Sequence, residues 1–173
     1  MTDLDKMISR VESSISDPHE GLPQEVFLFI TRNTPMINVD LLIKNEQGQT
    51  LLTWREDGRP RAGWHVPGGI IRYKESFAER IVKTARNELG VGVEFNPVPL
   101  VINECISAHM KNRGHFISLL FECILAGKPS RDLECRGGQP GAGEWMWHDR
   151  CPENILALHA ELYGKFIDPQ AGA

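Results

Sequence analysis

The sequence predicts a single domain of the mixed α/β class. Its 173 residues suit one domain, and an apolar fraction of 41% is enough to build a core. Apolar runs typical of strands alternate with amphipathic segments typical of helices, and the clearest helix follows a pair of glycines. We expect one domain over residues 1–173, with a helical extension at 1–33 and a core at 34–173.

The first third of the chain predicts two helices and a hairpin. Pro23 suits the first turn of a short helix. The runs 36–44 and 49–55 predict two strands, joined by a turn at 45–48. Before them, residues 3–14 predict an amphipathic helix, because apolar side chains recur there at helical spacing: Leu4, Met7, Ile8 and Val11.

The middle of the chain combines a glycine pair with the strongest helix signal. A polar loop at 56–63 leads into an extended stretch, 65–71, which holds the glycines. Gly90 stands where a left-handed helix cap is expected. The helix itself is expected at 75–89, where one apolar stripe runs along it: Phe77, Ala78, Ile81, Val82, Ala85 and Leu89.

The last third predicts three strands and a closing helix. Strands are expected at 99–107, 115–125 and 144–149. Glycine and proline make 127–143 a loop. A final helix is expected to begin near Pro152 and to complete the mixed α/β order.

Charge and hydropathy argue against two classes of partner. A net charge of −4 and a pI of about 5.9 argue against nucleic acid, because proteins that bind the phosphate backbone present a basic face. The N-terminus is polar, and no apolar run approaches the ~20 residues that span a bilayer. We therefore expect no membrane partner and a cytoplasmic protein.

The cysteines predict neither disulfides nor zinc. They form no CxxC pair, and His148 with Cys151 is spaced like only half of a zinc site. We interpret all four as buried or inert thiols: Cys105, Cys123, Cys135 and Cys151.

The segment Gly69–Val91, GIIRYKESFAERIVKTARNELGV, joins a glycine turn to an acidic helix. Such a junction points backbone N–H groups and the positive end of the helix dipole at an anion. Carboxylates on one helix face can then hold Mg²⁺, which prefers oxygen ligands. Thr84 and Glu88 are four residues apart and share such a face.

Two acids have structural alternatives to a functional role. Glu75 lies near the helix start, where a salt bridge to Lys83 or Arg86 explains it as well as chemistry does. Asp40 lies in an apolar strand, and a buried acid is costly unless it is paired. This favours a functional role for Asp40, with a salt bridge to a nearby arginine as the alternative.

The segment resembles the Nudix box, whose usual form is Gx5Ex7REUxEExGU with U an apolar residue. Both glycines, Glu75 and Glu88 match, Lys83 replaces the arginine, and Thr84 and Asn87 stand where the box has glutamates. The preceding WHVPGG looks like the family's WxxPGG. The resemblance implies the Nudix fold, a mixed β-sheet sandwiched between α-helices, and a hydrolase that uses Mg²⁺, with Mn²⁺ as the alternative metal.

The depleted box is similar to that of the GDP-mannose mannosyl hydrolases, a Nudix subgroup that hydrolyses at the sugar carbon. Residues 33–46, NTPMINVDLLIKNE, look like the subgroup's first strand. The resemblance implies hydrolysis of GDP-mannose or a close nucleotide sugar to the nucleoside diphosphate and the free sugar. It also implies a homodimer, with a small-molecule nucleotide sugar as the other partner.

The same resemblance assigns catalytic and metal-binding roles. Asp40 and Arg55 correspond to residues that assist departure of the diphosphate. Gly68, through its carbonyl, and Glu88 correspond to metal ligands. Gln139 is the nearest match to a further ligand from the loop before the last strand.

Substrate contacts follow from the resemblance as well. Phe27 falls at the subgroup's base-contacting phenylalanine, and Arg55 offers a planar donor fork to the diphosphate. Gly69 belongs to the phosphate-binding turn. The subgroup has an arginine just after the glycine pair. Ile70 stands at that position here, and Arg72 is the nearest basic residue.

The water-activating base has several candidates. Pro140 stands where the subgroup has its catalytic histidine. His109, His115 and Glu144 could each take that role, and His109 aligns better than His115 with a subgroup histidine near the pocket.

The sequence is also compatible with two other functions. The first is conventional Nudix cleavage at phosphorus, which needs an acid outside the helix, such as Glu144 or Glu104, to replace the missing glutamates. The second is a non-catalytic module that senses a nucleotide sugar.

Overall fold

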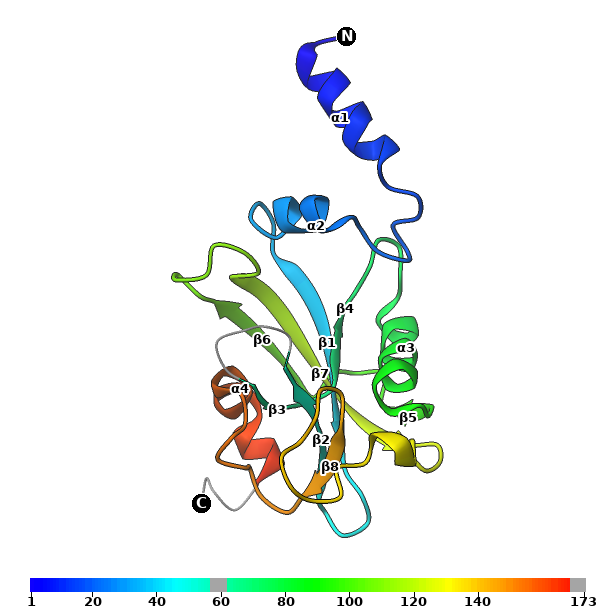
Figure 1. Cartoon of the computed structure of the whole chain (residues 1–173), viewed down its shortest axis with the longest axis vertical. Coiled ribbons are helices and arrows are strands. Elements are labelled where there is room, and N and C mark those ends of the chain that lie inside the picture. Colours follow the sequence, from blue (N-terminus) through cyan, green and yellow to red (C-terminus); the bar gives the residue numbers. More distant parts are fainter. Residues whose placement is uncertain (57–61, 169–173) are drawn as a thin grey trace.

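Two β-sheets lie between helices in the computed structural model, which describes residues 1–56 and 62–168 (Figure 1). The mixed α/β class is confirmed. In chain order the elements are α1 (Asp3–Ser13), α2 (Gln24–Ile30), β1 (Met36–Ile43), β2 (Thr50–Arg55), β3 (Gly63–His65), β4 (Gly68–Ile70), α3 (Phe77–Leu89), β5 (Val93–Phe95), β6 (Val101–Ile106), β7 (His115–Leu125), the 3₁₀ helix η1 (Arg131–Leu133), β8 (Trp145–His148) and α4 (Ala157–Ile167).

The larger sheet is mixed. Its strand order is β4-β1-β7-β5, and β6 pairs with the other end of β7. Strands β1 and β7 run parallel, whereas the remaining pairs are antiparallel. The smaller sheet, β3-β2-β8, is antiparallel throughout. Because β4 pairs with β1, Asp40 lies directly opposite Gly68.

The core has two halves, one on each side of β1. Val39, Leu41 and Ile43 pack with α3, while Leu42 packs with α4. Figure 1 shows the two helices on opposite sides of the sheets. A strand buried on both faces is expected to read as a continuous apolar run, which explains the sequence of β1. Asp40 alternates with Val39 and Leu41, so it faces α4.

Helix α3 ends at Leu89 as predicted and begins at Phe77, two residues later than the predicted start at 75. Ser76 caps its N-terminus in a capping box with Glu79. Gly90 adopts the left-handed conformation, with φ 69°, and ends the helix as expected. The buried stripe contains Ile81, Ala85 and Leu89, which places Glu88 at the edge of the core.

Helix α1 projects away from the sheets (Figure 1). It is capped by Thr2 and Asp5, and every residue from 3 to 13 is exposed. Its predicted apolar stripe is therefore in solvent in the monomer: Leu4, Met7, Ile8 and Val11. Within the described residues, no helix has the length and apolarity needed to cross a membrane.

Two expected elements differ in the structure, and one strand was not expected. Residues 65–71 contain the end of β3 and all of β4, so the chain crosses here from the smaller sheet to the larger. The last helix begins at Ala157 rather than near Pro152, because residues 154–156 hydrogen-bond to Trp64 of β3. Strand β5 was not expected. Of the predicted loop 56–63, residues 57–61 lie outside the described part of the chain.

Candidate functional site

A cleft of about 820 Å³ lies between α2, β1, β4, the loop 107–114 and α4. Its polar end lies where β1 meets β4, and its apolar end lies under α2. Six of the residues predicted to act on substrate or metal line it: Phe27, Asp40, Arg55, Gly68, Gly69 and Arg72.

Gly68 lies in direct contact with the carboxyl group of Asp40. A Cβ atom at position 68 would lie 2.2 Å from Asp40 Oδ1, which no side chain tolerates. The glycine therefore allows an acid on β1 to reach the backbone of the neighbouring strand. Glycine is therefore required at position 68 because the Asp40 carboxyl group occupies the space that a side chain would take.

Asp40 is held by two hydroxyl groups. Its Oδ2 accepts hydrogen bonds from Ser118 Oγ at 2.6 Å and from Tyr163 Oη at 2.7 Å. These two hydroxyls also contact each other. Burial raises the pKa of Asp40, although both hydrogen bonds and the positive charge of Arg55 act in the opposite direction. The hydroxyls therefore fix the position of an acid that is 5% exposed.

Glu88 reaches the same place from α3. Its Oε1 accepts from the backbone N–H of Gly68 at 3.1 Å, and its Oε2 accepts from Thr53 Oγ1 at 2.9 Å. His65 Nε2 lies 3.6 Å from Oε2. Burial, with a smaller contribution from the negative charge of Asp40, raises the pKa of Glu88 to about 7, although the hydrogen bonds from Thr53 and Gly68 and the positive charge of Arg55 act in the opposite direction.

The carbonyl oxygen of Gly68 points to the same side of β4 as Glu88. The backbone hydrogen bonds to β1 on either side of Gly68 run from Leu41 N–H to Pro67 O and from Ile71 N–H to Ile37 O. Gly68 lies between these bonded positions, so both its N–H and its C=O point away from β1. Since its N–H donates to Glu88, its carbonyl lies on the same side.

The structure brings two of the three predicted metal ligands together. Glu88 and the Gly68 carbonyl share one side of β4, whereas Gln139 is exposed on the loop before β8 and is not among the described residues that line the cleft. Within residues 1–56 and 62–168, no group of three His, Cys, Asp or Glu side chains could hold a metal by itself.

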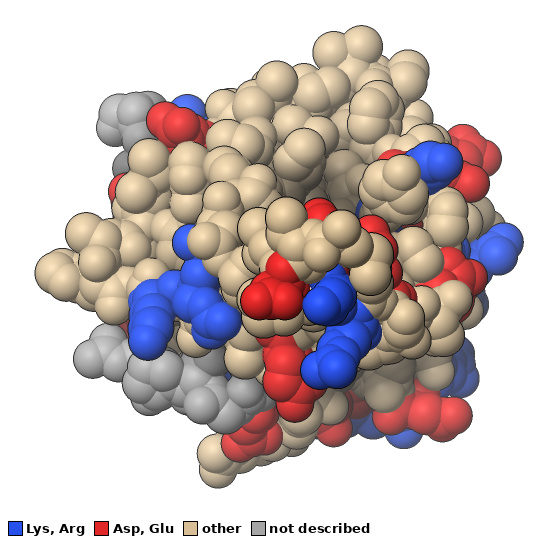
Figure 2. Space-filling view, turned by 90° about the horizontal axis from the view of Figure 1, so that it is seen from above, with Lys and Arg blue, Asp and Glu red and all other residues tan. Residues whose placement is uncertain are grey.

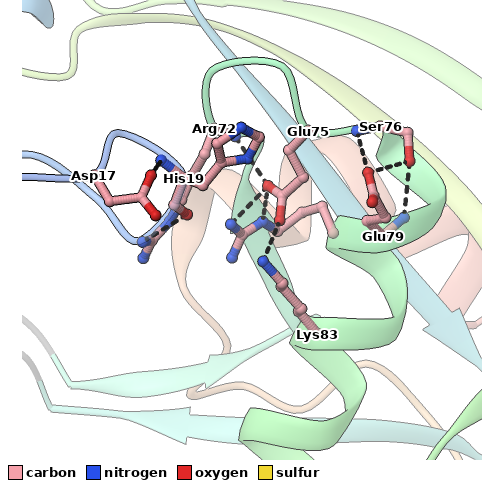
Figure 3. A network of polar contacts seen from close by, with 8 residues as sticks. Asp17, His19, Arg72, Glu75, Ser76, Glu79 and Lys83 are labelled. Carbon is pink, nitrogen blue, oxygen red and sulfur yellow. Dashed lines mark hydrogen bonds and ion pairs between the residues drawn. The ribbon is translucent and has the colours of Figure 1, made fainter.

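Glu75 anchors the glycine turn to α3 (Figure 3). It accepts a hydrogen bond from Arg72 N–H at 3.0 Å, and it pairs with Arg80 Nη2 at 2.6 Å and with Lys83 Nζ at 3.3 Å. Burial acts to raise the pKa of Glu75, but these interactions hold it below its ordinary value. The salt-bridge alternative thus applies to Glu75, with Arg80 rather than Arg86 as the second partner.

The turn is also tied to the N-terminal segment. Arg72 Nη1 donates to the carbonyl of His19 at 3.2 Å (Figure 3). A Cβ at Gly21 would lie 3.0 Å from the same guanidinium atom. The segment before α2 thereby forms one wall of the cleft, to which Glu20 and Gly21 contribute.

Two buried polar atoms near the cleft lack partners among the described residues. One is Thr84 Oγ1, on α3, which would lie 2.6 Å from a Cβ at Gly69. The other is Asn38 Oδ1, on β1 two residues before Asp40. Buried polar atoms are usually hydrogen-bonded, so these two atoms beside the cleft are exceptions.

The predicted bases lie elsewhere. His109 is exposed on the loop after β6, and His115 Nε2 lies 3.7 Å from Glu104 Oε1. Glu144 accepts a hydrogen bond from Gly141 N–H at 3.0 Å. None of these four is among the described residues that line the cleft.

Sequence reasoning missed a histidine that does line the cleft. His159, on α4, accepts a hydrogen bond at Nδ1 from Val66 N–H at 3.2 Å. It packs edge-on against His65 and Tyr163, with ring centroids 5.7 Å and 5.3 Å away. Its spacing of four from Tyr163 places both on one helix face, but the sequence does not tell which face meets the sheet.

Charge on the α1 end of the molecule is mixed. Figure 2 shows acidic and basic side chains next to one another at the centre of this face, with uncharged surface over much of the rest. The described part of this face thus has no continuous basic surface of the kind that binds a nucleic acid backbone.

Comparison with known proteins gives a family match and a fold match. Residues 34–164 match the family described as NUDIX domain. The low-salt glycan biosynthesis protein Agl8 of Haloferax volcanii is 37% identical over 76 residues, which are 44% of this chain and 48% of that protein. The chain thus matches about half the length of this relative.

Solved structures support the same fold. A MutT NUDIX hydrolase from Burkholderia pseudomallei superposes with a TM-score of 0.59 at 18% identity, over 75% of this chain and 95% of that one. A UDP-X diphosphatase gives a TM-score of 0.54 at 19% identity, over 99% and 81% of the two chains. At these identities the likeness concerns the fold.

Proposed function

The chain belongs to the Nudix hydrolase family, and on that premise we propose that it hydrolyses a nucleoside diphosphate sugar, GDP-mannose or a close relative. Water attacks the anomeric carbon of the sugar. The nucleoside diphosphate and the free sugar are released. The Haloferax relative supports a sugar-containing substrate, because its name refers to glycan biosynthesis.

The observation that carries this proposal is the shortage of carboxylates on α3. Glu88 is the acid of its last turn, while Thr84 is a buried hydroxyl and Asn87 an exposed amide. Attack at phosphorus needs a strongly activated nucleophile held by several acids. Departure of a diphosphate from carbon needs mainly charge stabilisation, which Glu88 with one metal ion and Arg55 can provide.

Nudix hydrolases generally use divalent metal ions such as Mg²⁺. The groups around Gly68 fit such an ion, because carboxylate and carbonyl oxygens are the ligands it prefers. Asp40 raises the pKa of Glu88 through negative charge that a cation would offset. We propose that Glu88 and the Gly68 carbonyl hold the metal, with Gln139 as a further ligand. When bound, the metal neutralises charge on the diphosphate.

The chain's own side chains bind and orient the substrate. Arg55 and Arg72 line the cleft and present planar donors to the diphosphate. Asp40, fixed by two hydroxyls, lies beside them and assists departure of the leaving group. Phe27, at the other end of the cleft, contacts the base.

The hydrogen bond from Val66 argues against His159 as the water-activating base. Because its Nδ1 accepts from Val66 N–H, the neutral ring carries its proton on Nε2 and is a donor rather than a base. For the water-activating group the candidates are His109 and Glu144, neither of which is among the described residues that line the cleft.

We also propose that the chain acts as a homodimer. The supporting observation is the apolar stripe of α1, whose side chains are 45–61% exposed. Exposed apolar patches of this kind mark interaction surfaces.

A turnover assay with Mg²⁺ and product identification tests the proposed function. GDP and mannose from GDP-mannose support it. GMP and mannose 1-phosphate indicate conventional cleavage at phosphorus, which is the alternative enzyme. Tight binding of nucleotide sugars without turnover of any of them indicates a sensing module.

A further inference from the structure

At the apolar end of the cleft, the guanidinium of Arg113 lies over the ring of Phe27, with Cζ 5.7 Å from the ring centroid. The two residues come from the loop 107–114 and from α2, and both line the cleft with Phe116. A second contact joins the loop to the segment just after α2, because Arg32 Nη1 donates to Asn112 Oδ1 at 3.1 Å. These contacts hold the loop that carries Arg113 against the helical extension.

The backbone of the loop also directs Arg113. Its φ is 56°, a left-handed conformation that side chains other than glycine rarely adopt. Gly114 follows, and a Cβ there would lie 2.5 Å from the carbonyl oxygen of Met110. Residues held in such conformations cluster at binding sites, where the fold has to aim a side chain.

The distance between the apolar end and the diphosphate end of the cleft suits the span of a nucleoside diphosphate. Phe116 pairs with Met36 on β1, and Asp40 follows four residues later on the same strand. A strand rises about 3.3 Å per residue, so the two ends are separated by roughly 13 Å. An extended nucleoside diphosphate whose phosphates lie at Arg55 would place its base near Phe27 and Arg113.

We propose that Arg113 selects the base by donating two parallel hydrogen bonds to the O6 and N7 atoms of a guanine-type purine. A guanidinium presents paired N–H donors in one plane, which match these two acceptors. Adenine offers an amino group in place of O6, and pyrimidines lack the pair. This inference rests on the proposed function, since it concerns the nucleotide of the same substrate.

Calorimetric titration tests the assignment without turnover. GDP, IDP, ADP and UDP are titrated with Mg²⁺ into wild-type protein and into the Arg113→Gln and Arg113→Lys variants. IDP keeps O6 and N7 but lacks the 2-amino group of guanine. Lys111→Gln is the matched control, because Lys111 is exposed on the same loop and its loss removes the same charge.

We expect GDP and IDP to bind roughly 10- to 100-fold more tightly than ADP or UDP, as one good bidentate pair allows. Arg113→Gln should bring GDP to the level of ADP and leave ADP unchanged. Arg113→Lys should lose most of the preference, since lysine cannot donate as a planar fork. Lys111→Gln should keep the preference.

Three results would overturn the assignment. Equal affinities of wild-type protein for GDP and ADP would remove base selection while leaving the proposed function intact. An equal loss of GDP and ADP binding in folded Arg113→Gln would make Arg113 a general anion contact. Binding of none of the four nucleotides by wild-type protein would remove both this inference and the proposed function.

Discussion

The backbone N–H of Gly68 donates a hydrogen bond to Oε1 of Glu88 over 3.1 Å, and it thereby joins the edge strand β4 to the last turn of α3. Gly68 also lies against the carboxyl group of Asp40. Residues 40, 68 and 88 thus meet at one point of the fold. Because each contributes a different group there, each can be tested by a different substitution.

Glu88→Gln should keep the fold but lower kcat by ~10²-fold or more, the scale of losing one strong transition-state contact. The amide is close in size to the carboxylate but carries no charge with which to bind a metal. Steady-state kinetics with Mg²⁺ measures the effect. Asn87→Ala, on the same helical turn but exposed, is the control and should stay within a few-fold of wild type. Near-normal turnover of Glu88→Gln would remove Glu88 from the mechanism.

The stability of the metal-free protein should depend on the titration of Glu88. Its pKa is about 7 in the folded protein, raised by burial above the ordinary value of 4.5. Between these values the folded state holds a proton that the unfolded chain releases. The stabilising contribution is therefore complete below about pH 4.5 and is lost as pH rises toward 7.

Thermal denaturation of metal-free wild type and Glu88→Gln measures this dependence. The Tm of wild type minus the Tm of the variant should fall between about pH 5 and about pH 7.5. Added Mg²⁺ should raise the wild-type Tm more at the higher pH, because a carboxylate ligand must be deprotonated. A Tm difference that stays constant with pH would contradict the raised pKa.

Gly68→Ala should destabilise the protein by ~1–3 kcal/mol, the usual range for overpacking a close contact. The added Cβ would lie 2.2 Å from Asp40 Oδ1. The double variant Asp40→Ala/Gly68→Ala removes the atom that clashes, so its two effects should not add. Chemical denaturation of the two single variants and the double variant measures the coupling. Strict additivity would show that the glycine is not required by Asp40.

The water-activating group is expected to be His109 or Glu144. His109→Ala or Glu144→Gln should lower kcat by ~10²–10⁴-fold, the range for loss of a general base. His115→Ala is measured beside them, because His115 is the third candidate and, like the other two, is not among the described residues that line the cleft. If all three variants stay within a few-fold of wild type, the base lies elsewhere or the metal alone activates the water.

Much of the fold could be predicted because its signals are local. The apolar run of β1 and the stripe and caps of α3 each lie within a few consecutive residues. The start of α4 was wrong because residues 154–156 bond to β3, a tertiary contact that propensity does not contain. Strand β5 spans three residues, too few to show a period.

The same distinction applies to the candidate site. Asp40, Gly68 and Glu88 could be found because an acid in an apolar strand and a glycine–helix motif are visible in the sequence. Tyr163 and His159 were missed because their importance depends on which face of α4 meets the sheet. Ser118 is a small hydroxyl within an apolar strand, and only its bond to Asp40 distinguishes it.

The most direct test is the position of bond cleavage. Hydrolysis of GDP-mannose by the Mg²⁺-loaded protein in ¹⁸O-water, followed by mass spectrometry, identifies the atom that water attacks. The arrangement of Glu88, Asp40 and Arg55 predicts attack at carbon, which puts the label in mannose and releases unlabelled GDP. Label in a phosphate group, with GMP and mannose 1-phosphate as products, would contradict the account.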